Sequence, residues 1–233
     1  MNKRLDQLYQ MIPKDGIGII DIGTDHGSIP IQLAASGYSG AIYASDIVPS
    51  PLNAAREAAR KGNVENRIRF LLCDGLDQCP PDEVDCILIA GMGGDTICGI
   101  LDRADWIFSD RYLFLFQPMT KPEVLRYWLI HNEFQIITEA VVTEDRHIYQ
   151  IFSAKLGKSR SMKDAEYLIG SCSSQRAGES VLYVINEQLK RIEKKLHGLE
   201  TASDTANPGY EFYAEIKRQL EKMLLDHTEL KDG

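Results

Sequence analysis

The chain has 233 residues and a mass of 26.2 kDa, which allows one large domain or a domain of about 150 residues with an appended unit. Its net charge of −8 at pH 7 argues against a general nucleic-acid-binding protein. The chain has no apolar run long enough to span a membrane and no signal-peptide core. Its five cysteines are odd in number and form no Cys-x-x-Cys pair. We therefore expect a cytoplasmic protein without membrane spans, disulfides or a metal.

The first 131 residues alternate short apolar runs with helical patterns. A short helix at 3–11 precedes a first strand at 17–21 and a helix at 28–36. We expect further strands at 41–46, 68–72, 85–90 and 112–116, and helices at 51–61, around 94–101 and at 122–131. The fourth strand is followed by a predicted glycine turn. Continuous apolar strands of this kind are typical of a parallel sheet covered by helices on both faces.

Two further extended stretches, 134–142 and 148–154, are separated by a short polar segment that is too short for a helix. They should therefore pair as an antiparallel hairpin. Together with the five preceding strands, the hairpin predicts an α/β fold. We expect a doubly wound, Rossmann-like sheet of seven strands with an antiparallel strand near one edge.

The last third of the chain shows a different pattern. Apolar residues recur at spacings of three and four, which indicates two helices with heptad seams. The seam positions are Leu182, Ile185, Leu189, Ile192, Leu196 and Leu199, and then Tyr213, Ile216, Leu220 and Met223. A break at 201–209 favours an antiparallel hairpin of helices over separate coiled-coil dimers. We therefore expect two domains, an α/β domain at 1–156 and a helical coiled-coil domain at 157–233.

The carboxyl ends of the predicted parallel strands carry acids and glycines, and ligands bind at this edge of a doubly wound sheet. Asp46 ends the second strand, where a carboxylate can accept hydrogen bonds from both hydroxyls of a ribose. Asp74 follows the third strand, where it can accept from the amino group of an adenine. Gly23 permits close approach of a ligand to the backbone. These residues predict a pocket for an adenosine.

The loop after the first strand reads Asp-Ile-Gly-Thr-Asp-His-Gly at 21–27. A pyrophosphate-binding loop of the Gly-x-Gly-x-x-Gly type would have glycine where Asp25 stands, and a carboxylate there would repel phosphate. An acidic loop suits a ligand that carries an ammonium and a sulfonium group. We therefore prefer S-adenosylmethionine to a dinucleotide.

Each feature also has a purely structural interpretation. Asp21 could bond turn amides, Asp46 could cap the following helix, and Asp74 with Gly75 could form an ordinary turn. His26 could simply start a helix. Acids or glycine clusters at four consecutive strand ends are less easily explained by chance, which favours a binding site.

Four segments together resemble the bacterial tRNA (adenine-22, N1)-methyltransferases. They are residues 21–26 (Asp-Ile-Gly-Thr-Asp-His), 73–76 (Cys-Asp-Gly-Leu), 90–94 (Ala-Gly-Met-Gly-Gly) and 115–118 (Leu-Phe-Gln-Pro). Residues 139–149 and the order of an α/β domain before a coiled-coil hairpin are also similar to that family. The resemblance covers nearly the whole chain and implies methylation of N1 of an adenine in tRNA with S-adenosylmethionine.

The resemblance implies that Asp46 binds the ribose, that Asp74 and Gly75 face the adenine, and that Arg4 pairs with the carboxylate of the cofactor. The candidate cofactor-binding residues are Arg4, Asp21, Gly23, Asp25, His26, Asp46, Ile47, Asp74, Gly75, Ala90 and Gly91. The candidate substrate-binding residues are Met92, Gly93, Gly94, Gln117, Pro118, Lys190, Arg191 and Lys194. The basic residues of the helical hairpin could grip the tRNA, or could form a solvated helix face.

Adenine N1 already has a lone pair, so transfer in line from sulfonium to nitrogen needs alignment more than a strong base. No side chain stands out as a catalytic base. Backbone carbonyls near Ala90 and Gly91 are expected to hold the exocyclic amine.

Other functions remain open at this point. They are a methyltransferase for another RNA, a protein or a small molecule, a nucleotide-sensing domain without activity, and an NAD-dependent dehydrogenase. We expect a monomer or weak homodimer.

Overall fold

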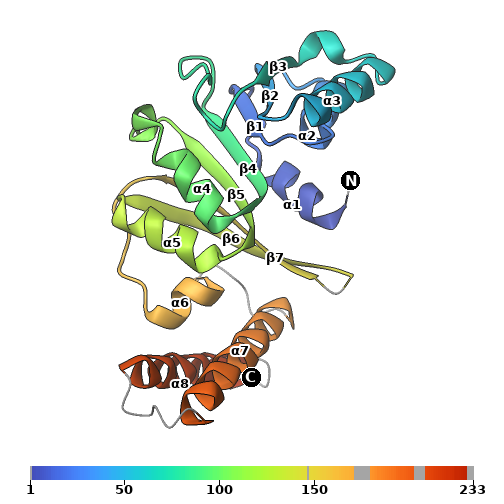
Figure 1. Ribbon diagram of the computed structural model, residues 1–233. Helices are drawn as coiled ribbons and strands as arrows, with labels where there is room; N and C mark the ends of the chain where they lie inside the picture. The colour runs from blue at the N-terminus through green and yellow to red at the C-terminus, as the bar shows by residue number, and fades with distance from the viewer. Residues whose placement is uncertain (1, 146, 171–178, 202–207, 230–233) are drawn as a thin grey trace. The chain divides into compact units, whose positions relative to one another are not determined.

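The computed structural model describes residues 2–145, 147–170, 179–201 and 208–229. The chain divides into two compact units, unit 1 at Met1–Ser159 and unit 2 at Arg160–Gly233 (Figure 1). In the part of the chain that the structure describes, no helix is both long and apolar enough to cross a membrane.

Unit 1 is built on one sheet of seven strands. The strands are β1 Ile19–Ile22, β2 Ile42–Asp46, β3 Arg69–Leu72, β4 Cys86–Gly93, β5 Leu113–Thr120, β6 Phe134–Glu144 and β7 His147–Leu156. Their order is β3-β2-β1-β4-β5-β7-β6, with β1 to β5 parallel and β7 antiparallel to both neighbours. This confirms the predicted doubly wound sheet and its hairpin. The order reverses between β1 and β4, where ligands bind in such sheets.

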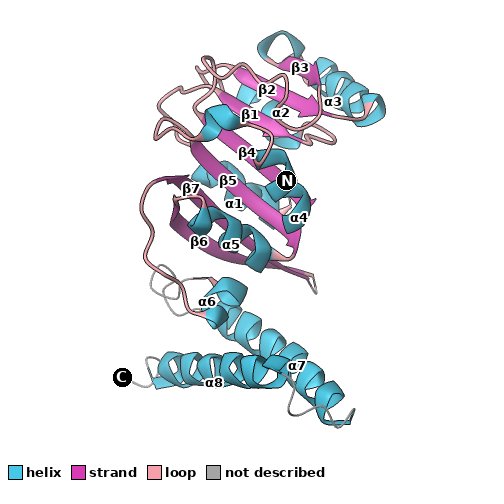
Figure 2. Cartoon of the chain, turned by 60° about the vertical axis from the view of Figure 1, so that its left-hand side comes forward, coloured by secondary structure: helices cyan, strands magenta, loops and turns pink. Residues whose placement is uncertain are grey.

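Helices cover both faces of this sheet. They are α1 Lys3–Met11, α2 Ser28–Ala35, α3 Pro49–Lys61, α4 Gly94–Leu101 and α5 Pro122–His131. Helices α4 and α5 pack on one face, and α1, α2 and α3 pack on the other (Figures 1 and 2). Alternate residues of β4 enter the two cores: Ile87 and Ile89 join the α4 and α5 side, and Leu88 joins the other. Burial on both faces explains why the strand sequences are continuously apolar.

The fourth strand differs from its prediction. We expected it to end at residue 90 before a glycine turn, but β4 continues through Gly93 and pairs with β5. The pairing skips Gly91, which has a positive φ of 80°, so the ladder is irregular between Ala90 and Met92. Opposite Met92 lies Pro118, which has no N–H to donate to the ladder. The glycines therefore form a bulged strand end instead of a turn.

The described part of unit 2 contains α6 Asp164–Ile169, α7 Glu179–Thr201 and α8 Pro208–Glu229. The helices α7 and α8 pack against each other, and seam residues Ile185, Ile192 and Leu220 are buried. This confirms the expected pairing of the two heptad segments within one chain, while most of the predicted break between them lies outside the described residues. Helix α6 has no counterpart in the prediction because its few residues carry no heptad signal.

Helix α3 of unit 1 begins two residues earlier than expected, because proline is tolerated in a first helical turn.

Candidate functional site

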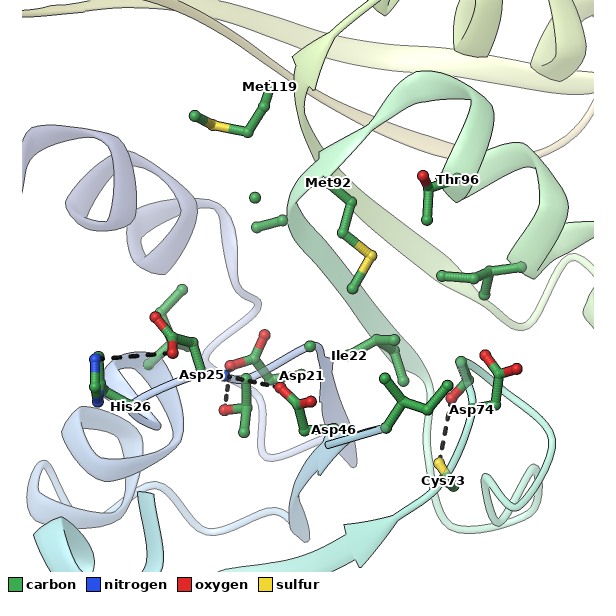
Figure 3. A pocket seen from close by; sticks show the side chains of 18 of the residues that line it. Asp21, Ile22, Asp25, His26, Asp46, Cys73, Asp74, Met92, Thr96 and Met119 are labelled. Atoms are coloured by element: carbon green, nitrogen blue, oxygen red, sulfur yellow. Dashed lines mark hydrogen bonds and ion pairs between the residues drawn. The ribbon is translucent and has the colours of Figure 1, made fainter. Parts of the chain in front are cut away.

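A cavity of about 670 Å³ opens at the carboxyl ends of the central strands of unit 1. This volume lies in the range of pockets for small molecules. Figure 3 shows Asp21, Asp25 and Asp46 gathered at neighbouring strand ends, with the Met92 side chain extending toward them. The cavity wall contains every predicted cofactor residue: Arg4, Asp21, Gly23, Asp25, His26, Asp46, Ile47, Asp74, Gly75, Ala90 and Gly91. The fold therefore brings together residues that are up to 87 positions apart, since Arg4 and Gly91 lie on one wall.

The loop after β1 needs left-handed backbone at Gly23 and Asp25, whose φ angles are 70° and 50°. A Cβ added to Gly23 would lie 2.2 Å from the Cε atom of Met92, which is the flexible end of that side chain. The loop is tied to β2 because the Thr24 N–H donates to the Ser45 carbonyl at 2.9 Å. Glycine at position 23 thus lets the backbone itself form the cavity wall, as the sequence predicts.

Asp21 is a buried carboxylate at the end of β1, with 7% of its surface exposed. The hydroxyl of Thr24 donates to its Oδ2 at 2.8 Å. Burial raises the pKa of the Asp21 carboxyl to about 7, the Thr24 hydrogen bond opposes this shift, and the charge of Asp46 adds to it. Near neutral pH the group is poised between its two forms, and a cation in the cavity would favour the ionised one.

We expect the free energy of unfolding of the ligand-free protein to fall as the pH rises from about 4 to about 7. The native carboxyl of Asp21 holds its proton to about pH 7, whereas the unfolded one loses it near the ordinary value of 3.8. Stability from this group is therefore complete below about pH 4 and is lost as the pH passes through the native pKa. The loss is at most about 4 kcal/mol, and urea denaturation at pH 5 and pH 8 measures it.

Asp21→Asn removes this ionisation, so the variant should be more stable than the wild type at pH 8 and show a smaller change between the two pH values. The matched control is Asp110→Asn, at an exposed aspartate outside the cavity. An unchanged pH slope in Asp21→Asn would contradict the assignment of this buried ionisation to Asp21.

Asp46 is held at the end of β2 by the amides of two turns. Its Oδ1 accepts from the Val48 N–H at 2.9 Å, and its Oδ2 accepts from the Asp25 N–H at 3.4 Å. Helix α3 has Val48 as its N-cap, so Asp46 is not the capping residue of that helix. Each carboxylate oxygen keeps acceptor capacity for a further donor. Ile47 beside it is 59% exposed and offers an apolar surface to the cavity.

Asp74 and Gly75 form the turn after β3, and Gly75 adopts a left-handed φ of 57°. Across from them, one side of α4 contributes Thr96, Gly99 and Ile100 to the wall, followed by Arg103 just past the helix end. These four residues were not among the predicted site residues. Their spacing of three, four and seven positions along a helix is the signal that could have revealed them.

Arg4 projects from α1 into the cavity wall. Its Nη1 donates to Gln117 Oε1, and its guanidinium lies 5.5 Å from the centroid of the Tyr149 ring. Gln117 is fully buried, and its Nε2 donates to the Pro118 carbonyl at 3.0 Å. We predicted Gln117 and Pro118 as substrate residues, but neither lies on the cavity wall. Gln117 accepts a hydrogen bond from the Arg4 guanidinium, and the role of Gln117 and Pro118 in binding substrate stays a prediction.

The other predicted substrate residues fall into two groups. Met92 lies on the wall, and Gly93 and Gly94 do not. A Cβ on Gly94 would lie 2.2 Å from the Lys121 carbonyl oxygen, so this glycine lets the start of α4 pack closely against the residue that precedes α5. Lys190, Arg191 and Lys194 are exposed on α7 in unit 2. Among the described residues, no group of three or more His, Cys, Asp or Glu side chains could hold a metal ion.

Three comparisons relate the chain to known proteins. A protein-family profile described as a methyltransferase domain matches residues 1–152. The chain is 26% identical to the tRNA (adenine(22)-N(1))-methyltransferase of Bacillus subtilis, over 99% of this chain and 94% of that protein.

Two solved structures are similar over nearly the full length. The structure of M. capricolum TrmK in complex with S-adenosylhomocysteine matches with a TM-score of 0.80 and 25% identity, over 96% of this chain and 97% of that one. The crystal structure of the B. subtilis m1A22 tRNA methyltransferase TrmK matches with a TM-score of 0.78 and 25% identity, over 98% and 97%. The likeness includes both units of the chain.

Proposed function

Because the chain belongs to the methyltransferase-domain family, we propose that it is a tRNA (adenine-22, N1)-methyltransferase that uses S-adenosylmethionine. One observation carries the proposal. The acids at the ends of β1 and β2 and after β3 share one cavity with the bulged glycine segment of β4. That arrangement occurs in a chain whose whole length matches an enzyme of this specificity.

The cavity fits S-adenosylmethionine on three points. Its wall carries the carboxylates of Asp21, Asp25 and Asp46, which attract an ammonium and a sulfonium and repel a pyrophosphate. A Cβ added to Gly99 would meet nothing within 4 Å, so the α4 wall leaves open space for a flat ring. Arg4 provides a cation for the carboxylate of the ligand. When bound, S-adenosylmethionine supplies an electrophilic methyl group on its sulfonium.

In the proposed complex, Asp46 accepts from the ribose hydroxyls and Asp74 accepts from the amino group of the cofactor adenine. Arg4, held by Gln117, pairs with the methionine carboxylate. Gly23, Asp25 and His26 surround the methionine part. These residues would hold the ligand in one orientation at the carboxyl ends of the strands.

The target adenine is proposed to enter beside Met92, with Ala90 and Gly91 carbonyls accepting from its exocyclic amine. The bulge aids this role because Pro118, opposite Met92, has no N–H to offer to β4. Adenine N1 would use its own lone pair to take the methyl group as the bond from that methyl to sulfur breaks. S-adenosylhomocysteine would leave and the methylated base would carry the positive charge, so alignment would supply most of the rate. The base must be extruded from the tRNA fold to reach the cavity.

We further propose that residues 1–156 form the catalytic domain and that residues 157–233 form a tRNA-gripping domain. Lys190, Arg191 and Lys194 are exposed cations on α7 that suit phosphate contact, although Lys190 also pairs with Glu187 at 2.7 Å. The basic cluster Lys155, Lys158, Arg160 and Lys163 is a second source of phosphate contacts, within which Arg160 pairs with Glu166. We propose a monomer or weak homodimer that acts in the cytoplasm.

The proposal predicts position-specific methylation. Unmodified tRNA transcripts with adenine or guanine at position 22 are incubated with the full chain and S-adenosylmethionine bearing a labelled methyl group. We expect label only in the adenine-22 transcript, and mass-spectrometric mapping should place it as 1-methyladenine at that position.

Other outcomes identify the alternatives. Methylation of both transcripts alike, or of a protein or small molecule instead of tRNA, would replace the proposed acceptor. Methyl transfer to no acceptor despite tight cofactor binding would favour a sensing domain. Tight calorimetric binding of NAD with no binding of S-adenosylmethionine would overturn the cofactor.

A further inference from the structure

Arg103 joins two parts of the cavity wall that are distant in sequence. It lies just past the end of α4, and its Nη1 donates to the Gly99 carbonyl of that helix at 3.2 Å. Its Nη2 donates to Asp74 Oδ1 at 2.8 Å, and its Nε points to Asp77 Oδ1 at 3.5 Å. The guanidinium therefore uses its fixed fork of donors to hold the turn after β3 against α4.

The surroundings of this contact indicate orientation more than stability. The side chains of Arg103 and Asp74 are 44% and 52% exposed, and ion pairs with such exposure contribute little to the free energy of unfolding. The turn is nevertheless closely packed, because a Cβ on Gly75 would lie 2.8 Å from Ile100 Cγ2 and 3.3 Å from Arg103 Nη2. Both Asp74 and Arg103 lie on the cavity wall. The contact therefore fixes where the Asp74 carboxylate points.

We propose that Arg103 is a positioning residue, which turns the Asp74 carboxylate toward the amino group of the bound cofactor adenine and so makes the site specific for adenine. Arg103 engages Oδ1, and no contact among the described residues engages Oδ2. The free oxygen is the acceptor for the amino group. This inference rests on the proposed function, since it assumes an adenosine-containing cofactor.

The test compares S-adenosylhomocysteine with S-inosylhomocysteine, whose ring has an oxygen in place of the amino group. Isothermal calorimetry on the full chain gives Kd for both. We expect the wild type to prefer the adenine compound by between about tenfold and about a hundredfold, the range for a hydrogen bond to a charged group. Arg103→Met should reduce this preference by about fivefold or more.

Four further variants test whether the change in preference depends on the contact between Arg103 and Asp74. Asp74→Asn should reduce the preference by itself, and adding Arg103→Met to it should change the preference no further. Arg103→Lys keeps the positive charge but loses the forked guanidinium donors, so this variant's preference for the adenine compound should be intermediate. Arg111→Met is the matched control, because Arg111 also bridges an aspartate side chain and a backbone carbonyl, at Asp85 and Asp82, outside the cavity.

Several results would overturn the inference. If Arg103→Met raises the Kd of both compounds by the same factor, Arg103 has only a structural role. A wild type that binds both compounds equally well shows that Asp74 does not read the amino group, and this leaves the proposed function intact. If the wild type binds neither compound, the proposal of S-adenosylmethionine as cofactor is wrong, and so is this inference.

Discussion

Replacing Asp46 by alanine is expected to weaken S-adenosylmethionine binding by at least about a hundredfold and to abolish methyl transfer at ordinary cofactor concentrations. Two ribose hydroxyls would lose a charged acceptor, and each such hydrogen bond contributes about 1.5–3 kcal/mol. The substitution also removes the acceptor for the Asp25 and Val48 amides, which hold the two adjoining turns. Calorimetric titration of the full chain measures the loss.

Asp46→Asn separates these two effects. The amide oxygen can still accept from one turn, so the loops should remain ordered while the charged acceptor is lost, and we expect a smaller reduction of affinity. Asp82→Ala is the control, because its carboxylate is fully exposed and lies outside the cavity. Wild-type affinity in Asp46→Ala would show that the ribose is not bound at the end of β2.

Glu139→Ala is expected to lower the free energy of unfolding of unit 1 by about 3–5 kcal/mol. The side chains of Arg126 on α5 and Glu139 on β6 are both 1% exposed, and Arg126 Nε donates to Glu139 Oε1 at 2.8 Å. Arg126 also donates to Gln150 Oε1 at 2.7 Å and lies 4.8 Å from the centroid of the Phe152 ring. Truncating Glu139 leaves a buried guanidinium without its main countercharge.

The chain contains two tryptophans, Trp106 and Trp128, and both lie in unit 1. Urea denaturation followed by tryptophan fluorescence therefore reports on this unit by itself. The double variant Arg126→Met with Glu139→Leu removes both charges and should recover most of the lost stability. Glu57→Ala at the surface pair with Arg60 should change stability by less than about 0.5 kcal/mol. Equal destabilisation by all three variants would refute the buried-charge explanation.

The sequence predicted what depends on local pattern. Continuous apolar runs indicated strands buried on both faces, and heptad spacing indicated the α7 and α8 pair. Acids and glycines at the strand ends marked the cavity, because in a parallel sheet those ends meet at one edge. Asp46 and Asp74 were therefore predicted to share one pocket, and both line the cavity.

Tertiary packing decided what local pattern could not. The bulge in β4 forms because the pairing with β5 continues past Gly91. The residues around Gly91 alone do not indicate this pairing, so they were predicted to form a glycine turn. Gln117 turned out to support Arg4, since the partner of a buried amide is set by which helix packs over the strand.

The sequence by itself determined the fold class, and it predicted a ligand-binding edge of the sheet with an acidic wall, because these follow from periodicity and charge along the chain. Only the tertiary structure decided that Asp21 is buried enough for its pKa to reach about 7, and that Arg103 reaches Asp74. Both depend on atoms brought together from distant segments, and desolvation and hydrogen-bond geometry act on distances in space.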